Sequence, residues 1–141
     1  MSYTEQFTEV HELLGRLPPL TYNGGVSTDW IAVNDYHRVV VIVSAGTLLG
    51  TLNVAVFQAT DPAGSGAKVI SGKAITQLAA TDDNAICAIE IRTEELDVDG
   101  GFDCIRVQTT SSAANVFSVI VLGVVSRYNP VGVTEWDEVV D

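Results

Sequence analysis

The chain is dominated by two apolar stretches, VVVIV at residues 39–43 and VFSVIVLGVV at residues 116–125. Both are rich in Val and Ile, whose branched side chains favour the pleated backbone of a strand. Shorter stretches of the same kind, separated by Gly, Asn, Asp and Ser, occupy the rest of the chain. About eight such segments, with no helical pattern between them to connect parallel strands, predict an all-β fold with antiparallel strands.

An antiparallel β-sandwich is the architecture that this series of strands favours, with a jelly roll as the first topology and an immunoglobulin-like arrangement as the second. We expect the sandwich to span residues 20–128, between an N-terminal helical arm at 1–19 and an acidic C-terminal arm at 129–141. In the two longest stretches, consecutive positions are apolar, which suits strands covered on both sides. One side would meet the core, and the other a second subunit or the terminal helix.

The two arms supply the candidate interface residues. Apolar residues recur every three or four positions from Phe7 to Leu17, which predicts an amphipathic helix over residues 4–16 that ends at Pro18-Pro19. Such a helix must bury its apolar side, either on its own sandwich, which we favour, or on a neighbouring subunit. The candidate interface residues are Phe7, Val10, Leu13, Leu14, Leu17 and, in the C-terminal arm, Trp136.

The charge balance excludes several partners. The 141 residues include 18 Asp and Glu but only 7 Lys and Arg, a formal net charge of −11. Nucleic acids are bound by Lys and Arg, so we expect no direct contact with them. The longest apolar stretch is about half the length needed to cross a bilayer, and the first residues lack the layout of a signal peptide. We therefore expect no membrane partner and synthesis in a cytoplasm.

Residues suited to catalysis are scarce. His11 falls in the predicted helix and His37 at the start of a strand, and no Gly-x-Ser-x-Gly motif is present. Cys87 and Cys104 are each flanked by apolar residues, which indicates free thiols in the core rather than activated nucleophiles. We predict that the chain is not an enzyme and that it uses no cofactor.

One acidic segment is a weak candidate for binding Ca²⁺. Asp97, Asp99 and Asp103 flank a Gly-Gly pair and place three carboxylates at near-alternate positions. The segment lacks the complete series of ligands and the closing Glu of a calcium loop. A turn between two strands is the favoured interpretation, and no metal is predicted.

Several short motifs carry a family resemblance. In order along the chain they are DYHR at 35–38, QATD at 58–61, GKAITQL at 72–78, RTEELDV at 92–98 and FDCIRV at 102–107. Over residues 29–128 the chain resembles small structural proteins of tailed bacteriophages that are encoded among the head-morphogenesis genes. The resemblance implies a virion protein assembled in the host cytoplasm and, among virion proteins, a decoration or cement protein. Such a protein binds the major capsid protein on the outer head surface as a homo-oligomer, often a trimer, and stabilises the shell.

Two other functions stay open. Within a virion, the chain could instead be a head–tail connector or a component of the tail tube, which would form rings or stacked tubes. A glycan-binding sandwich would require exposed aromatic side chains, and the only reasonable contributors are Trp30, Tyr36, Tyr128 and Trp136.

Overall fold

The computed structural model describes residues 6–126 and 137–139 and confirms the predicted all-β antiparallel fold. Its elements are α1 (Phe7–Val10), β1 (Glu12–Ser27), β2 (Ile31–Ala32), β3 (Tyr36–Ala45), β4 (Leu52–Ala59), β5 (Lys68–Ala74), β6 (Ile86–Arg92), the 3-10 helix η1 (Thr93–Glu95) and β7 (Cys104–Ser126). Strand β3 contains the apolar stretch 39–43 that the sequence predicts to be a strand. Every strand pairing in the described residues is antiparallel.

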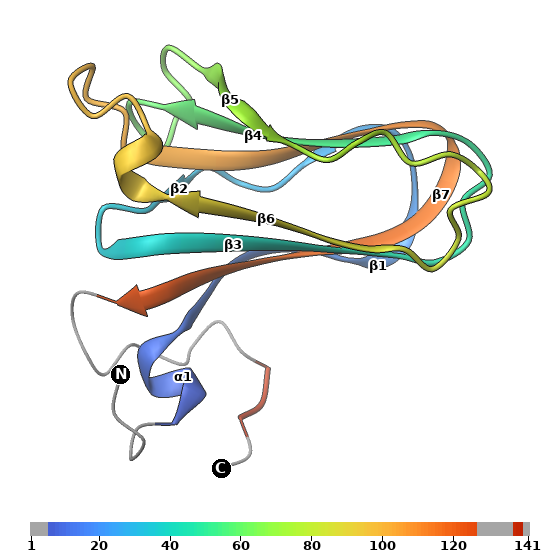
Figure 1. Cartoon of the computed structure of the whole chain (residues 1–141), viewed down its shortest axis with the longest axis horizontal. Coiled ribbons are helices and arrows are strands. Elements are labelled where there is room, and N and C mark those ends of the chain that lie inside the picture. Colours follow the sequence, from blue (N-terminus) through green and yellow to red (C-terminus); the bar gives the residue numbers. More distant parts are fainter. Residues whose placement is uncertain (1–5, 127–136, 140–141) are drawn as a thin grey trace.

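Two long strands, β1 and β7, pass through both layers of a sandwich (Figure 1). The first part of β7, residues 104–111, pairs with β4 and with the second half of β1. Its last part, residues 117–126, pairs with β3, and this part also pairs with the first half of β1. The lower layer of Figure 1 therefore has the order β6-β3-β7-β1, and the upper layer has the order β5-β4-β7-β1.

This strand order is that of a jelly roll. When β1 and β7 are each divided into two halves and the two-residue β2 is left aside, the chain has eight strand segments. Numbered along the chain, these segments have the order 1-8-3-6 in the lower layer and 2-7-4-5 in the upper layer. Two four-stranded sheets joined in this way form the double-sheet jelly roll. The first predicted topology is thus confirmed.

The core lies between the two layers and is built from alternate positions of the strands. Val39, Val41 and Val43 of β3 are fully buried, as alternation of side chains along a strand requires. The other layer contributes side chains of the same kind, and the largest fully buried residues are Phe117, Leu52, Ile91, Ile105, Val33, Val39, Val41, Val43, Val54, Val56, Val107 and Val119.

The N-terminal helix is much shorter than the sequence predicts. Helix α1 ends at Val10, and Leu13, Leu14 and Leu17 belong to β1 instead. A helix over residues 4–16 would be only marginally stable by itself in water. As a strand, the segment gains backbone hydrogen bonds to β7 and buries Leu13 and Leu17. Tertiary pairing therefore overrides the local helical spacing, and the boundary predicted at residue 19 falls inside a strand.

Residues 110–115 are polar or small, a composition that predicts a turn, but β7 continues through them from one layer to the other. Asn115 lies at this crossing and is fully buried. Its Oδ1 accepts hydrogen bonds from the backbone N–H groups of Leu49 (2.9 Å) and Gly50 (3.1 Å), and its Nδ2 donates to the Thr51 carbonyl (3.0 Å). The side chain ties the β3–β4 connection to the crossing.

Candidate interaction surface

The outer side of the lower layer is apolar as well as its inner side. On β3, Val40 and Ile42 alternate with the buried valines and point away from the core. They lie directly opposite Leu122 and Ile120 of β7, with Val124 one position further along the same side. Directly opposed side chains of neighbouring strands share one face of a sheet. We call the surface formed by Val40, Ile42, Ile120, Leu122 and Val124 the β3–β7 face.

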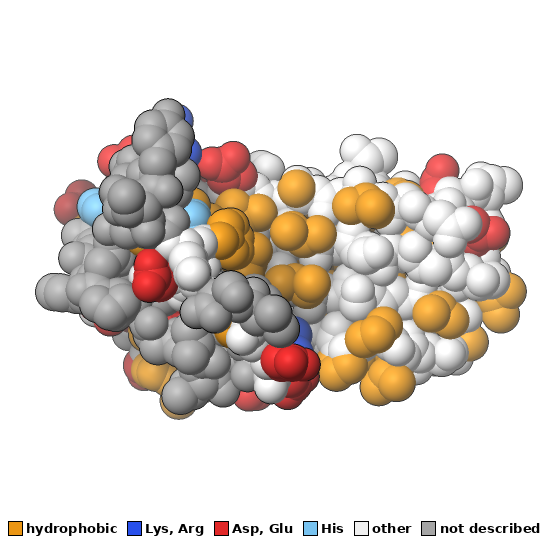
Figure 2. Space-filling model, turned by 90° about the horizontal axis from the view of Figure 1, so that it is seen from below, with side chains coloured by type: hydrophobic (Ala, Val, Ile, Leu, Met, Phe, Trp, Pro, Cys, Tyr) orange, Lys and Arg blue, Asp and Glu red, His pale blue; other side chains and the backbone are white. Residues whose placement is uncertain are grey.

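The side chains of the β3–β7 face are partly exposed to solvent. Ile120 is 38% exposed, and the other four side chains are partly exposed. Figure 2 looks onto this side of the molecule and shows hydrophobic side chains gathered near its middle. A contiguous apolar surface on a folded protein marks a site of interaction, whereas single exposed apolar residues do not.

The outer side of the upper layer is different in character. There Asn53 of β4 lies opposite Thr110 of β7, and Phe57 lies opposite Arg106. Arg106 also stacks on Trp30, with the guanidinium 4.5 Å from the ring centroid. An antiparallel sheet that faces water on one side alternates apolar and polar residues, as the upper layer does. The lower layer does not alternate in this way at the five positions of the β3–β7 face, which are all apolar.

Two basic groups at the border of the β3–β7 face are paired with carboxylates of the same chain. Arg38 lies 3.6 Å from the carboxylate of Glu90, and Arg16 lies 3.1 Å from that of Asp137. In each pair, at least one of the two side chains is more than half exposed to solvent. Each ion pair therefore contributes little to the free energy of unfolding. Glu138, which lies beside Ile120 at the same border, has no ion pair among the described residues, so this border keeps an acidic group.

A hollow adjoins the β3–β7 face at strand β1. Its lining includes Leu13, Pro18, Pro19 and Ile120, together with Asp137 and Glu138 near the C-terminus. Pro18 and Pro19 have no backbone N–H, and they occupy the edge strand of the lower layer. Proline at an edge prevents another strand from pairing there.

The structure places the predicted interface residues in different environments. Leu17 is part of the core, and Leu14 packs against it. Val10 and Leu13 are buried, and Leu13 lies opposite Leu122 beside the β3–β7 face. Phe7 is 54% exposed on α1, where it stacks on His11. Trp136 lies outside the described residues.

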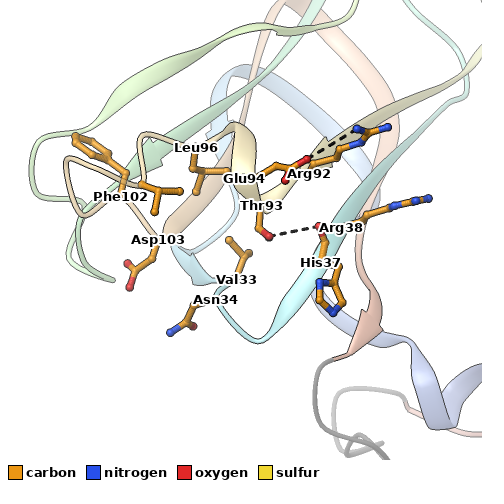
Figure 3. Close-up of a pocket in the computed structure, with 11 residues that line it drawn as sticks. Val33, Asn34, His37, Arg38, Arg92, Thr93, Glu94, Leu96, Phe102 and Asp103 are labelled. Carbon is orange, nitrogen blue, oxygen red and sulfur yellow. Dashed lines mark hydrogen bonds and ion pairs between the residues drawn. The ribbon is translucent and has the colours of Figure 1, made fainter.

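A second feature is an open pocket of about 640 Å³ at one end of the sandwich (Figure 3). His37 lines this pocket, but other residues that line it make hydrogen bonds or ion pairs within the chain. The Thr93 hydroxyl donates to the backbone carbonyls of Tyr36 (3.0 Å) and His37 (3.3 Å). Arg92 lies 3.9 Å from Glu94, and in Figure 3 Arg38 points away from the pocket. Among the residues lining this pocket, no nucleophile is paired with a base.

The acidic loop considered for Ca²⁺ has other partners. Asp97 lies 2.6 Å from the ammonium of Lys68 and accepts a hydrogen bond from the Gly100 N–H (3.0 Å). These two interactions hold the pKa of Asp97 below its ordinary value, the Lys68 hydrogen bond being the larger cause. Asp103 accepts from the Cys104 thiol. Within residues 6–126 and 137–139, no three His, Cys, Asp or Glu side chains form a group that could hold a metal ion.

The cysteines are free thiols in the structure. Cys104 is buried, and burial, with a smaller contribution from Asp103, raises the pKa of its thiol to about 12. A thiol in this state is a poor nucleophile. In the part of the chain that the structure describes, no helix has the length and apolar character needed to span a membrane.

Comparison with known proteins leaves the family of this chain open. No protein-family model matches the sequence, and no curated protein sequence matches it either. Among solved structures, the cowpea mosaic virus top component, a naturally occurring empty particle, is similar over 91% of this chain and 94% of its own, with 10% identity and a TM-score of 0.47. The Triatoma virus structure matches 94% of this chain and 74% of its own, with 9% identity and a TM-score of 0.44.

A structure of PirA is similar over 84% of this chain and 97% of its own chain, with 17% identity and a TM-score of 0.43. Similarity at this level identifies neither a partner nor an activity, because a single fold serves many functions. The strand order of the chain itself identifies the fold as a jelly roll, and the side chains of its β3–β7 face are partly exposed.

Proposed function

We propose that this chain is a structural protein of a virus particle, and more specifically a decoration or cement protein on the outer head surface of a tailed bacteriophage. The observation that carries the proposal is the β3–β7 face, which gives a chain of net charge −11 an apolar surface suited to assembly. The phage context comes from the ordered motifs between residues 29 and 128. Proteins of this kind act by binding through their surfaces. The polar residues around Asp97 and His37 agree with such a role, because they form hydrogen bonds and ion pairs within the chain.

In this role the chain binds the major capsid protein as a homo-oligomer, for which the resemblance implies a trimer. It reinforces the shell without catalysis. An outer position keeps its acidic surface away from the packaged nucleic acid, whose phosphates would repel it. The complete particle is where the chain functions, after assembly in the host cytoplasm.

Binding to empty heads tests this proposal. Heads assembled from the cognate major capsid protein alone are mixed with purified chain and recovered by sedimentation. We expect saturable binding and a higher temperature of head disruption, measured by the release of capsid protein on heating. A chain that stays monomeric and never sediments with heads would contradict the proposal. Rings or stacked tubes in electron micrographs would instead favour the connector or tail-tube function.

The glycan-binding alternative has less support from the described residues. Tyr36 is buried, and its hydroxyl donates to Glu12. Trp30 is only partly exposed, with Arg106 over its ring and Gly64 close against it. Neither ring offers an open platform for stacking a sugar. Tyr128 and Trp136 lie outside the described residues, and binding to a glycan array would revive this alternative.

A further inference from the structure

We infer that the outer side of the upper layer binds a carboxylate of the major capsid protein at Arg106. The inference deepens the proposed function and rests on it, since it names the surface that meets the capsid and the chemical group that this surface recognises. Three observations support it: the unpaired charge of Arg106, the way in which its side chain is held, and the row of side chains in which it lies.

Arg106 has no ion pair in a chain with a large excess of carboxylates. The sequence contains 18 Asp and Glu against 7 Lys and Arg, of which Arg127 lies outside the described residues. Arg106 forms no ion pair with any described residue, whereas each of the other basic side chains does: Arg16, Arg38, Lys68, Lys73 and Arg92. Its charge is therefore available to a partner, and a carboxylate is the group that complements it in charge and in shape.

The Arg106 side chain is held in place by its neighbours. The guanidinium lies 4.5 Å from the centroid of the Trp30 ring. When the oxygen of the Gln108 amide faces Arg106, it accepts hydrogen bonds from Nε (3.2 Å) and Nη2. A guanidinium has five N–H donors, so Nη1 and the second hydrogen of Nη2 are left for a partner. These donors can bind both oxygens of a carboxylate, and little side-chain entropy is lost because the group is already oriented.

Arg106 belongs to a row of large side chains across the upper layer of Figure 1. Phe57 of β4 lies opposite Arg106 on one side and opposite Val69 of β5 on the other. On its other side Arg106 contacts Trp30, the residue before Ile31 of β2. Val69 is 52% exposed, and the other three side chains are partly exposed. Aromatic residues and Arg are enriched at the centres of protein interfaces, where Asp and Glu are depleted.

Acidic residues are missing from the strands around this row. No Asp or Glu occurs in the strand segments of the upper layer, which are residues 24–27, 52–59, 68–74 and 104–111. The acidic residues that give the chain its net charge of −11 lie elsewhere in the sequence. A carboxylate of a partner can thus reach Arg106 without meeting a like charge on these strands.

The spacing of the row specifies the partner further. Neighbouring strands lie about 4.8 Å apart, so Phe57 and Val69 lie about 5 and 10 Å from Arg106 along the row. Alternate residues of an extended segment point to the same side, about 6.7 Å apart. A capsid segment with an Asp or Glu two positions from an apolar residue would therefore place its carboxylate on Arg106 and its apolar side chain between Phe57 and Val69.

Two variants that each remove one positive charge test the inference. Arg106→Gln removes the unpaired guanidinium, whereas Arg92→Gln removes one that lies 3.9 Å from Glu94 at the end of β6. Binding of the full chain to heads assembled from the cognate major capsid protein alone is measured by co-sedimentation over a range of chain concentrations. We expect about 10- to 100-fold weaker binding for Arg106→Gln and wild-type binding for Arg92→Gln. Arg106→Lys should also bind more weakly than wild type, because an ammonium cannot form the two parallel hydrogen bonds.

Wild-type head binding by Arg106→Gln or by Arg106→Lys would overturn the inference, as would equal weakening by Arg106→Gln and Arg92→Gln. Weaker self-association of Arg106→Gln in sedimentation velocity, with unchanged head binding, would assign the row to a contact between copies and overturn it too. Circular dichroism verifies folding. If Arg106→Gln does not fold, Val69→Glu tests the same row from an exposed position, since its carboxylate should weaken head binding by repelling that of the partner.

The same measurement separates this inference from the proposed function. A wild-type chain that never sediments with heads contradicts the proposed function, and this inference with it. A chain that binds heads equally well with and without the Arg106 guanidinium contradicts the inference alone.

Discussion

Replacement of Asn115 by alanine is expected to destabilise the sandwich where β7 crosses between its layers. The side chain is fully buried and makes three hydrogen bonds to the backbone of residues 49–51. Loss of a buried partner costs about 1 kcal/mol or somewhat more for each hydrogen bond. Water can reach part of this exposed connection and replace some of the lost bonds. We therefore expect the free energy of unfolding to fall by about 2–4 kcal/mol.

Urea denaturation followed by circular dichroism measures this loss. With a slope of about 2 kcal/mol per M, the midpoint should fall by about 1–2 M. Ser112→Ala is the matched control, because the Ser112 hydroxyl accepts a single hydrogen bond from the Thr51 N–H (2.7 Å) at an exposed position. Its midpoint should stay close to that of the wild type. An Asn115→Ala midpoint equal to that of Ser112→Ala would refute the idea that the amide ties the connection to the crossing.

Three further predictions concern other parts of the sandwich. Gly123→Ala should lower the free energy of unfolding by about 1–3 kcal/mol, because a Cβ there would lie 2.5 Å from Cδ1 of the buried Tyr36 ring; an unchanged urea midpoint would contradict this. The Lys73 ammonium lies 2.7 Å from Glu95 and lowers the pKa of that carboxyl below 4.5, so the stabilisation is complete above pH 4.5 and is lost as the pH falls through the lowered pKa. The difference in urea midpoint between wild type and Lys73→Met should accordingly shrink from pH 7 to pH 3, and a difference independent of pH would argue against the ion pair. Finally, the Cys104 thiol, with its pKa of about 12, should be alkylated by iodoacetamide more slowly in the folded chain than the other cysteine, as mass spectrometry of the modified peptides would show.

Two strands of the lower layer, β3 in its middle and β6 at its edge, can be predicted from local sequence. Residues 36–44 and 86–92 have a period or composition that suits a strand, and both form strands in the structure. The strands that pair with them are partly distant in sequence. Alternating burial along a strand can nevertheless be predicted locally, because it needs only a second sheet on one side and not a particular partner strand. The jelly roll as the first topology rests on the same count of strands.

Strand β1 and the crossing of β7 could not be predicted in this way. The spacing of Leu13, Leu14 and Leu17 fits a helix locally, and only pairing with β7 makes the segment a strand. The polar and small residues from Thr110 to Asn115 have the composition of a turn. They remain extended because Asn115 finds buried hydrogen-bond partners in another part of the chain.

The candidate interaction surface was foreseen only in outline. Consecutive apolar residues at 39–43 and 116–125 predict strands with two apolar sides. Composition cannot decide which side faces the core, because both sides have the same chemistry. The side that faces the core is decided by the strand register. In this register Ile42 lies opposite Ile120 on the outer side, and the adjacent residues Val41 and Val43 point into the core. Sequence thus determined the strands and their apolar character, whereas the tertiary structure decided which apolar side is left for a partner, since a shift by one residue would exchange the two sides.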